Sequence, residues 1–164
     1  MKKLFFLVVV LSLGFVSMSH AQSSLSKGSG LVNVGAGFFP GVGGNASYDY
    51  GLIDHWGPGL FTVGGYFSAA IHTDTYGSTK YKRTKLFFAP RATYRYSINP
   101  KFEIFGSVMT GLLVKETSIE NQSYVAFGLM GGCRYFFTNN FGVFAEGGVN
   151  YETTCLNLGV SFAF

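Results

Sequence analysis

The chain has 164 residues, of which 12% are charged, 18% are aromatic and 23 are glycine. A soluble domain usually has about twice this fraction of charged residues, so the composition excludes an ordinary water-exposed surface. The chain is also too rich in apolar residues to remain disordered. Its formal net charge of +4 does not indicate a strongly charged partner such as nucleic acid.

The first residues have the pattern of a secretory signal peptide. Lys2 and Lys3 precede the apolar run Leu4 to Val16, and Ser19-His20-Ala21 offers small residues at the positions that signal peptidase reads. The run is shorter than the roughly 20 residues of a membrane-spanning helix, so we expect cleavage before Gln22. Without the two lysines the net charge is +4 − 2 = +2, and an exported chain rarely meets nucleic acid, which excludes that partner.

The exported part, residues 22–164, is long enough for one domain. It contains no apolar span of about 18 or more residues, which excludes transmembrane helices. Apolar residues instead alternate with small or polar ones, and in a β-strand such alternation places them on opposite faces. The pattern predicts eight strands, at residues 30–38, 45–53, 60–72, 85–98, 102–115, 124–137, 141–151 and 155–164.

The last predicted strand has the clearest alternation. One face is wholly apolar and consists of Leu156, Leu158, Val160, Phe162 and Phe164. In most segments the opposite face is small or polar with few charges, which suits a crowded interior but not the water-exposed surface of a soluble lipocalin-type barrel. We therefore predict that the apolar face contacts lipid, where an Arg or Lys near the midplane would cost roughly 2 to 4 kcal/mol.

A sheet in lipid has to close, because every backbone amide needs a partner inside the protein. The prediction is an all-β, eight-stranded antiparallel up-and-down transmembrane β-barrel. The links near residues 54–59, 99–101 and 138–140 are short, whereas residues 73–84 are expected to form a longer polar loop and residues 38–44 a Gly-rich one. Short turns belong on the periplasmic side and longer loops outside, so we expect both chain ends in the periplasm.

These features resemble the small outer-membrane barrels of the OmpX and OmpA transmembrane-domain type, within the broad porin family. The resemblance covers residues 22–164 and includes the terminal strand that ends in Phe162 and Phe164. It implies a location in the outer membrane of a Gram-negative bacterium, and insertion by the barrel assembly machinery through that terminal signal. The pattern describes an architecture and therefore implies no activity.

Several charged residues fall on the inward parity. A tight turn at residues 99–100 would place Arg95 opposite Glu103, and one at residues 138–140 would place Arg134 opposite Glu146. A buried charge without a partner costs several kcal/mol, so we expect cross-strand ion pairs. On the opposite wall the network can be extended by Asp49, Arg91 and Tyr66.

An eight-stranded interior is just wide enough for side chains, so we predict a lumen plugged by these polar and charged groups. Two alternatives remain open from the sequence. The charges can form a gate, or the barrel can be a narrow porin-like channel.

The predicted loop at residues 73–84 carries a basic and aromatic cluster of Lys80, Tyr81, Lys82 and Arg83. It can bind lipopolysaccharide phosphates or a host ligand, or it can simply keep the rim hydrated. The expected partners are therefore outer-membrane lipids, lipopolysaccharide and a surface ligand, bound by a monomer. Aromatic side chains near the strand ends are expected to anchor the barrel at the membrane interface. They are Trp56, Tyr76, Tyr81, Tyr96, Tyr135, Phe137 and Tyr151.

Three residues depart from regular alternation. Pro90 lies within a strand and cannot donate a ladder hydrogen bond, which predicts a bulge or local irregularity there. Phe87 and Phe144 fall on the inward parity, where we expect them to fill space beside glycines.

The two cysteines lie on different faces and near opposite ends of the predicted barrel. Cys133 is on the lipid parity and Cys155 on the inward parity, so their Cα atoms should be farther apart than the roughly 7 Å that a disulfide allows. We predict two free thiols. The spacings indicate no metal site and no cofactor.

A barrel enzyme that modifies lipid A is the rival class. It would need a base and a nucleophile in contact, and the candidates are His72 and Ser68, with Asp49 or Asp74 to orient the base. Residues four apart on a strand are about 13 Å apart, too far for that contact. No catalytic residue is therefore predicted, and we expect a structural or surface-interaction role in envelope integrity, adhesion or resistance to host factors.

Overall fold

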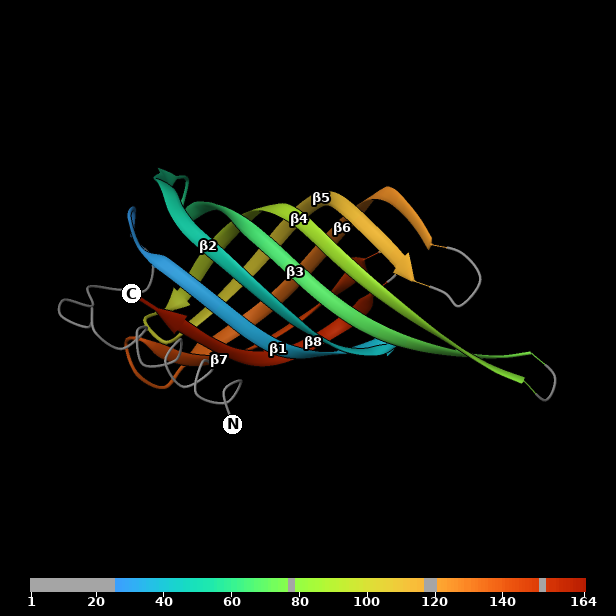
Figure 1. The fold of residues 1–164 in the computed structure, drawn as a ribbon. Coiled ribbons are helices and arrows are strands. Elements are labelled where there is room, and N and C mark those ends of the chain that lie inside the picture. The colour runs from blue at the N-terminus through green and yellow to red at the C-terminus, as the bar shows by residue number, and fades with distance from the viewer. Residues whose placement is uncertain (1–25, 77–78, 117–120, 151–152) are drawn as a thin grey trace, which may run out of the picture.

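The computed structural model describes residues 26–76, 79–116, 121–150 and 153–164. The predicted signal peptide, residues 1–21, lies outside the described residues. Within them, eight antiparallel strands follow in chain order around a barrel that the pairing of β1 with β8 closes (Figure 1). The strands are β1 (Gly30–Pro40), β2 (Val42–Trp56), β3 (Gly59–Tyr76), β4 (Thr79–Asn99), β5 (Phe102–Glu116), β6 (Asn121–Phe136), β7 (Phe141–Asn150) and β8 (Thr154–Ala163).

The predicted fold class is confirmed, but the loop predicted at residues 73–84 is wrong. These residues belong to a β3–β4 hairpin that continues the ladder, with Thr73 opposite Lys82 and Thr75 opposite Lys80. A strand that extends beyond the bilayer needs no continuous apolar face, so its sequence has the polarity of a loop.

The Gly-rich loop predicted at residues 38–44 is also wrong. Phe38 pairs directly with Val42, so only a tight turn joins β1 to β2. Gly41 lies in this turn, whereas Gly43 and Gly44 lie in β2. Gly43, for example, has the backbone of Ala69 so close that a Cβ atom would lie 2.0 Å from its carbonyl oxygen.

Alternate residues of each strand point into and out of the barrel. In β5, Phe105 and Met109 are buried, whereas Ile104 and Val108 are 42% and 46% exposed. In β8, Leu158 is 46% exposed although its neighbour Asn157 is completely buried. The apolar face is thus the outer one, which contradicts the soluble alternative with an apolar interior.

Phe144 fills space beside glycines, as expected from its inward parity. A Cβ atom added to Gly159 would lie 2.7 Å from the Phe144 ring, and one added to Gly35 would lie 3.0 Å from it. Gly35 and Gly159 are paired across β1 and β8. The ring therefore covers the seam that closes the barrel, where any larger side chain would collide with it.

Pro90 interrupts the sheet as predicted, without a bulge. It is paired with Gly65 on β3, but the β4–β5 ladder passes from the Phe88–Leu112 pair to the Arg91–Met109 pair without including it. The register is the same on both sides of this gap. The missing N–H donor of proline therefore breaks the ladder locally and does not shift it.

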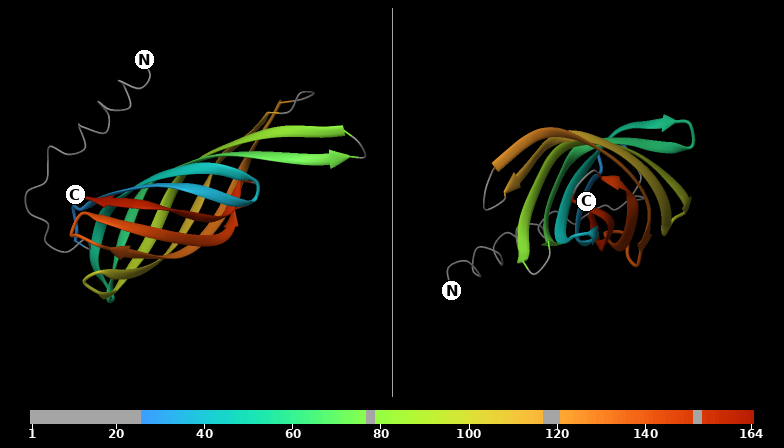
Figure 2. Two further views of the ribbon diagram at one scale, coloured as in Figure 1. Left: turned by 90° about the horizontal axis from the view of Figure 1, so that it is seen from below. Right: turned by 90° about the vertical axis from the view of Figure 1, so that its right-hand side faces the viewer.

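The barrel has two unlike rims. The terminal rim carries the two ends of the described chain and the turns at residues 57–58, 100–101 and 137–140. The hairpin rim carries the β1–β2 turn and the β3–β4 and β5–β6 hairpins, and the β3–β4 hairpin projects well past the β1–β2 turn (Figures 1 and 2). No helix in the described ranges is long and apolar enough to span a membrane.

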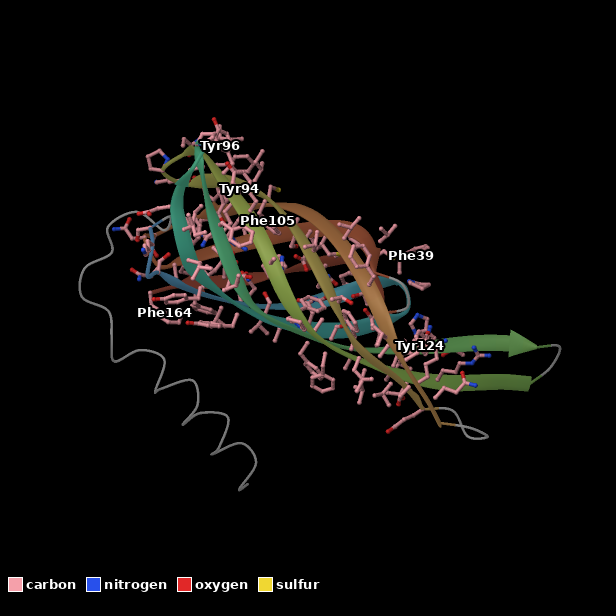
Figure 3. The ribbon with its side chains drawn as sticks, turned by 90° about the horizontal axis from the view of Figure 1, so that it is seen from above. Phe39, Tyr94, Tyr96, Phe105, Tyr124 and Phe164 are labelled. Atoms are coloured by element: carbon pink, nitrogen blue, oxygen red, sulfur yellow. The ribbon has the colours of Figure 1, made fainter. Side chains whose placement is uncertain are left out.

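Aromatic side chains gather at the terminal rim. Tyr94, Tyr96 and Phe164 lie at this end of the barrel, and Phe39 and Tyr124 lie toward the other (Figure 3). Of the aromatic anchors predicted from the sequence, Tyr96, Tyr135 and Phe137 are exposed here. The side chains of Trp56, Tyr76, Tyr81 and Tyr151 lie outside the described part of the structure.

Candidate functional site

The most distinctive cluster is a layer of ionic side chains across the middle of the lumen. Five strands contribute to it, because each places a charged residue on its inward parity. Every member is at most 3% exposed. The layer balances three cations against three anions: Arg91 and Arg95 on β4, Arg134 on β6, Asp49 on β2, Glu103 on β5 and Glu146 on β7.

Glu103 is the centre of one half of the layer. Arg95 donates two hydrogen bonds to it, from Nη2 to Oε2 at 2.9 Å and from Nε to Oε1 at 3.2 Å. Arg134 donates from Nη1 to the same Oε1 atom. Arg134 is further held by Ser161 Oγ at 2.8 Å and Asn33 Oδ1 at 3.1 Å. One carboxylate thus joins two guanidinium groups from strands on either side of it.

Arg91 is the centre of the other half. Its Nη2 atom lies 3.0 Å from Glu146 Oε2, and its Nε atom lies 3.9 Å from Asp49 Oδ1. It also donates to Ser47 Oγ at 3.2 Å and to Thr93 Oγ1 at 3.1 Å. The contact with Glu146 crosses the lumen, because β4 and β7 are not neighbours in the sheet.

The structure brings together all six charged residues predicted for the lumen, but with one partner exchanged. Arg95 contacts Glu103 as expected, although Phe105 is the residue directly opposite Arg95. The predicted Arg134–Glu146 pair is wrong. The β6–β7 register places Phe144 opposite Arg134 and Gly132 opposite Glu146, so Arg134 turns to Glu103, which faces it across β5 and β6.

Sequence reasoning missed the neutral residues that connect the two halves. Asn33 donates to Ser47 Oγ at 2.9 Å and to Asp49 Oδ2 at 3.3 Å, and it accepts from Arg134 and Ser161. Asn157 donates to Glu146 at 2.9 Å and to the Tyr66 hydroxyl at 3.3 Å. Their inward parity could have identified them in the sequence, because all of these residues are polar side chains on the buried face.

Apolar groups lie on both sides of the ionic layer. Toward the hairpin rim a buried cluster consists of Tyr66, Phe87, Ala89, Met109, Leu113, Ala126 and Met130. Toward the terminal rim a smaller cluster consists of Leu31, Phe136 and Ala163. The Phe105 ring joins the layers, since the Arg134 guanidinium lies 4.7 Å from its centroid and that of Arg91 lies 5.8 Å away.

The residues considered for an enzyme do not assemble a catalytic group. Ser68 and His72 are both buried on the inner face of β3, separated by the spacing of four strand residues. Asp49 is directed to the ionic layer, where Asn33 and Thr93 donate to it, and the side chain of Asp74 lies outside the described residues. Among described side chains, no group of three or more His, Cys, Asp or Glu could hold a metal ion.

Cys133 and Cys155 are both free and partly buried. Cys133 lies opposite Ile104 on the outer face, and Cys155 shares the parity of the buried Asn157. These are the positions predicted from the sequence.

The predicted basic loop is part of strand β4 toward the hairpin rim. Arg83 is half-buried and opposite His72. The side chains of Lys80, Tyr81 and Lys82 are outside the described part of the structure. The register adds Lys115, which faces Lys85 across β4 and β5, so the basic cluster extends over two strands and not over a loop alone.

A scan against protein-family models finds no match, and a search of the curated proteins finds none. Solved structures do match. Ail of Yersinia pestis, in complex with the heparin analogue sucrose octasulfate, aligns with a TM-score of 0.57 at 16% identity over 85% of this chain and 100% of that chain. The outer membrane protein Ail in a phospholipid bilayer nanodisc gives 0.51 at 17% identity, over 84% and 100% of the two chains. The N-terminal β-barrel domain of Pseudomonas aeruginosa OprF gives 0.50 at 19% identity, over 84% and 98%. The fold is that of a small outer-membrane β-barrel.

In an outer-membrane barrel fold the ionic layer has a clear physical role. Buried charges are tolerated only when they are paired and hydrogen-bonded, and each guanidinium here has several acceptors. The layer fixes the relative positions of strands from opposite walls.

Proposed function

We propose that this chain is exported to the outer membrane, spans it as a monomeric barrel with a plugged lumen, and acts at the cell surface in a structural or interaction role. The observation that carries the proposal is the sidedness of the barrel. Each strand presents an exposed apolar side chain outward, while the ionic groups are buried in the centre. The outward residues include Val34, Tyr48, Phe67, Phe88, Leu112, Leu129, Val143 and Leu158.

An apolar belt around a whole molecule is stable in lipid and would aggregate in water. The outward-facing rings at the terminal rim support the same location, because aromatic side chains favour the membrane interface. Phe164 stacks on Tyr48 with ring centroids 6.3 Å apart, and Phe162 packs on Phe141 at 5.3 Å. We propose that Phe162 and Phe164 also form the signal read by the barrel assembly machinery.

Membrane fractionation and heat-modifiable mobility test the location together. The protein should appear in the outer-membrane fraction, require detergent for extraction, and run faster on a denaturing gel before heating than after it. Recovery of native protein from the periplasmic fluid without detergent would contradict the proposal.

The buried ionic layer supports a plug over a pore, since its hydrogen bonds cross the lumen between strands that are not neighbours. In planar bilayers the purified protein should give no stable conductance of several hundred picosiemens. A stable conductance of that size would favour the porin-like alternative.

The comparisons also suggest a class of partner. Ail has been observed with a sulfated heparin analogue and in a phospholipid nanodisc. We propose outer-membrane lipids, lipopolysaccharide and a surface ligand as partners of this chain.

Replacing residues 73–84 with a neutral linker should reduce cell adhesion or survival in serum. Lipid A acylation should not change when the protein is overexpressed. Unchanged adhesion and survival would argue against the interaction role, and altered acylation would favour the enzyme.

A further inference from the structure

The turn between β1 and β2 is short and apolar, unlike the charged β3–β4 hairpin at the same rim. We call residues 38–42 the β1–β2 apex, and their sequence is Phe-Phe-Pro-Gly-Val. Phe39 is 78% exposed, the largest value among the described large apolar side chains, and Val42 is 66% exposed. The sequence has no charged residue between Val34 and Tyr48. The apex therefore carries no charge that would hold it in water.

The apex continues the outward apolar belt of the barrel without a break. Phe38 is paired with Leu156 on β8 and with Val42 on β2, and Val42 is paired with Ile71 on β3. All four side chains point outward and are 38% to 66% exposed, so they form one apolar row across four neighbouring strands. Strand β1 ends at Pro40, only two residues beyond this row, which is roughly 7 Å along the strand.

The outward face of the taller strands becomes polar at this row. Beyond Ile71, the next outward residue of β3 is the exposed Thr73. Ile71 is paired with Thr84 on β4, which in turn faces the exposed Glu116 on β5. The limit of the apolar belt thus lies near this row, and the apex stays apolar where the neighbouring strands do not.

The apex is held against β3 and does not stand free. Gly41 is buried, and a Cβ atom added to it would lie 2.7 Å from the Ile71 carbonyl oxygen and 2.7 Å from the His72 ring. Phe39 has a φ of 55°, in the left-handed region that bulky side chains rarely adopt. In water this residue would combine backbone strain with an exposed ring. Contact with acyl chains would remove the second of these two costs.

We propose that the β1–β2 apex is immersed in the bilayer, where the Phe39 ring contacts lipid acyl chains near the interface, while the β3–β4 hairpin stands in water. Phe39 lies at the end of the barrel body, and the hairpin extends beyond it (Figure 3). Because aromatic rings favour the membrane interface, the apex anchors the short wall of the barrel at a fixed depth. This inference rests on the proposed function, since it requires the outward belt to lie in a membrane.

Tryptophan fluorescence in phospholipid vesicles tests the immersion. The chain has one tryptophan, Trp56, so W56F gives a background in which a single new tryptophan reports one position. F39W and V42W place the reporter in the apex. L112W is the control within the belt, where Leu112 is 49% exposed, and T73W is the control on the exposed outward face beyond the belt. The quenchers are bromine on the acyl chains and iodide on both sides of the vesicles.

F39W and V42W should lose emission to brominated lipid as L112W does, and iodide should quench T73W but neither of them. Quenching of both apex reporters by iodide, with bromine quenching of L112W alone, would overturn the immersion and leave the membrane location standing. Protection of the apex reporters from both quenchers would assign the apex to contact with a second copy of the chain and would also overturn it.

Loss of bromine quenching at L112W as well would contradict the proposed function itself, and the immersion with it. Heat-modifiable mobility of each variant shows that it is folded. The two apex reporters keep the test decisive if one of them does not fold.

Discussion

At the scale of single residues, Glu103 is the side chain on which the lumen most depends. It is the shared acceptor for Arg95 and Arg134 and is 1% exposed. Its loss would leave two buried guanidinium groups without their carboxylate. An uncompensated buried charge is far more costly than the loss of an exposed pair.

We therefore expect Glu103→Gln to lower the free energy of unfolding by about 3 to 5 kcal/mol. The urea concentration at the midpoint of unfolding, measured in detergent, reports this loss of stability. Glu116→Gln makes the same chemical change at an exposed position and should shift the midpoint little. Similar midpoints for the two variants would mean that the ionic layer does not stabilise the barrel.

Gly159 is a second residue of importance, because its surroundings leave no space for a side chain. A Cβ atom there would lie 2.2 Å from the Val34 carbonyl oxygen and 2.7 Å from the Phe144 ring. Neither the backbone nor the packed ring can move freely, so we expect Gly159→Ala to destabilise the barrel by about 1 to 3 kcal/mol.

The matched control is Gly106→Ala, because a Cβ atom at Gly106 meets nothing within 4 Å. The temperature at which the compact gel band disappears should fall for the first variant and not for the second. The same temperature for both would show that the seam between β1 and β8 tolerates an extra methyl group.

At the scale of elements, the β3–β4 hairpin combines a part that belongs to the barrel with a part that projects from it. Near the ionic layer, β4 is flanked by β3 and β5 and carries Arg91 and Arg95. Farther along, β3 continues to Tyr76 and β4 begins at Thr79, both beyond the β1–β2 turn (Figure 1). The projecting part contributes nothing to the ionic layer.

Replacing residues 74–82 with a two-residue turn should therefore leave the barrel able to fold. The shortened protein should retain its heat-modifiable mobility and its place in the outer-membrane fraction. Failure to form the compact band would mean that the projecting hairpin is needed for assembly.

At the scale of the whole molecule, closure between β1 and β8 removes the last free edges of the sheet in the bilayer. Lipid offers no hydrogen bonds to an open edge. The seam is long, and it runs from the Leu31–Ala163 pair to the Pro40–Thr154 pair. Closure is thus a property of the complete set of strands.

Removing residues 154–164 should abolish the heat-modifiable form and the outer-membrane fraction. The shortened hairpin is the control, because it also shortens the chain but does not open an edge. A truncated protein that still accumulates folded in the outer membrane would contradict the closed-barrel account of its stability.

Alternation along the strands was enough to predict eight strands and the direction of each face, and the need for closure in lipid together with the link lengths predicted their antiparallel order. This succeeded because lipid and lumen impose opposite preferences on successive residues. Leu156 and Leu158 were assigned outward and Asn157 inward on this basis, and the structure agrees. The inward parity of six charged residues was also enough to place them in the lumen, although it left out the buried Lys85.

Only the tertiary structure decided how those charges are paired. The register of each hairpin depends on turn geometry, and a shift of two residues preserves parity while changing every partner. Arg134 therefore kept its predicted face but contacts Glu103 in place of Glu146. The same limit hid the pairing of Lys85 with Lys115, because which residues meet across strands follows from the closed sheet and not from the local pattern of either strand.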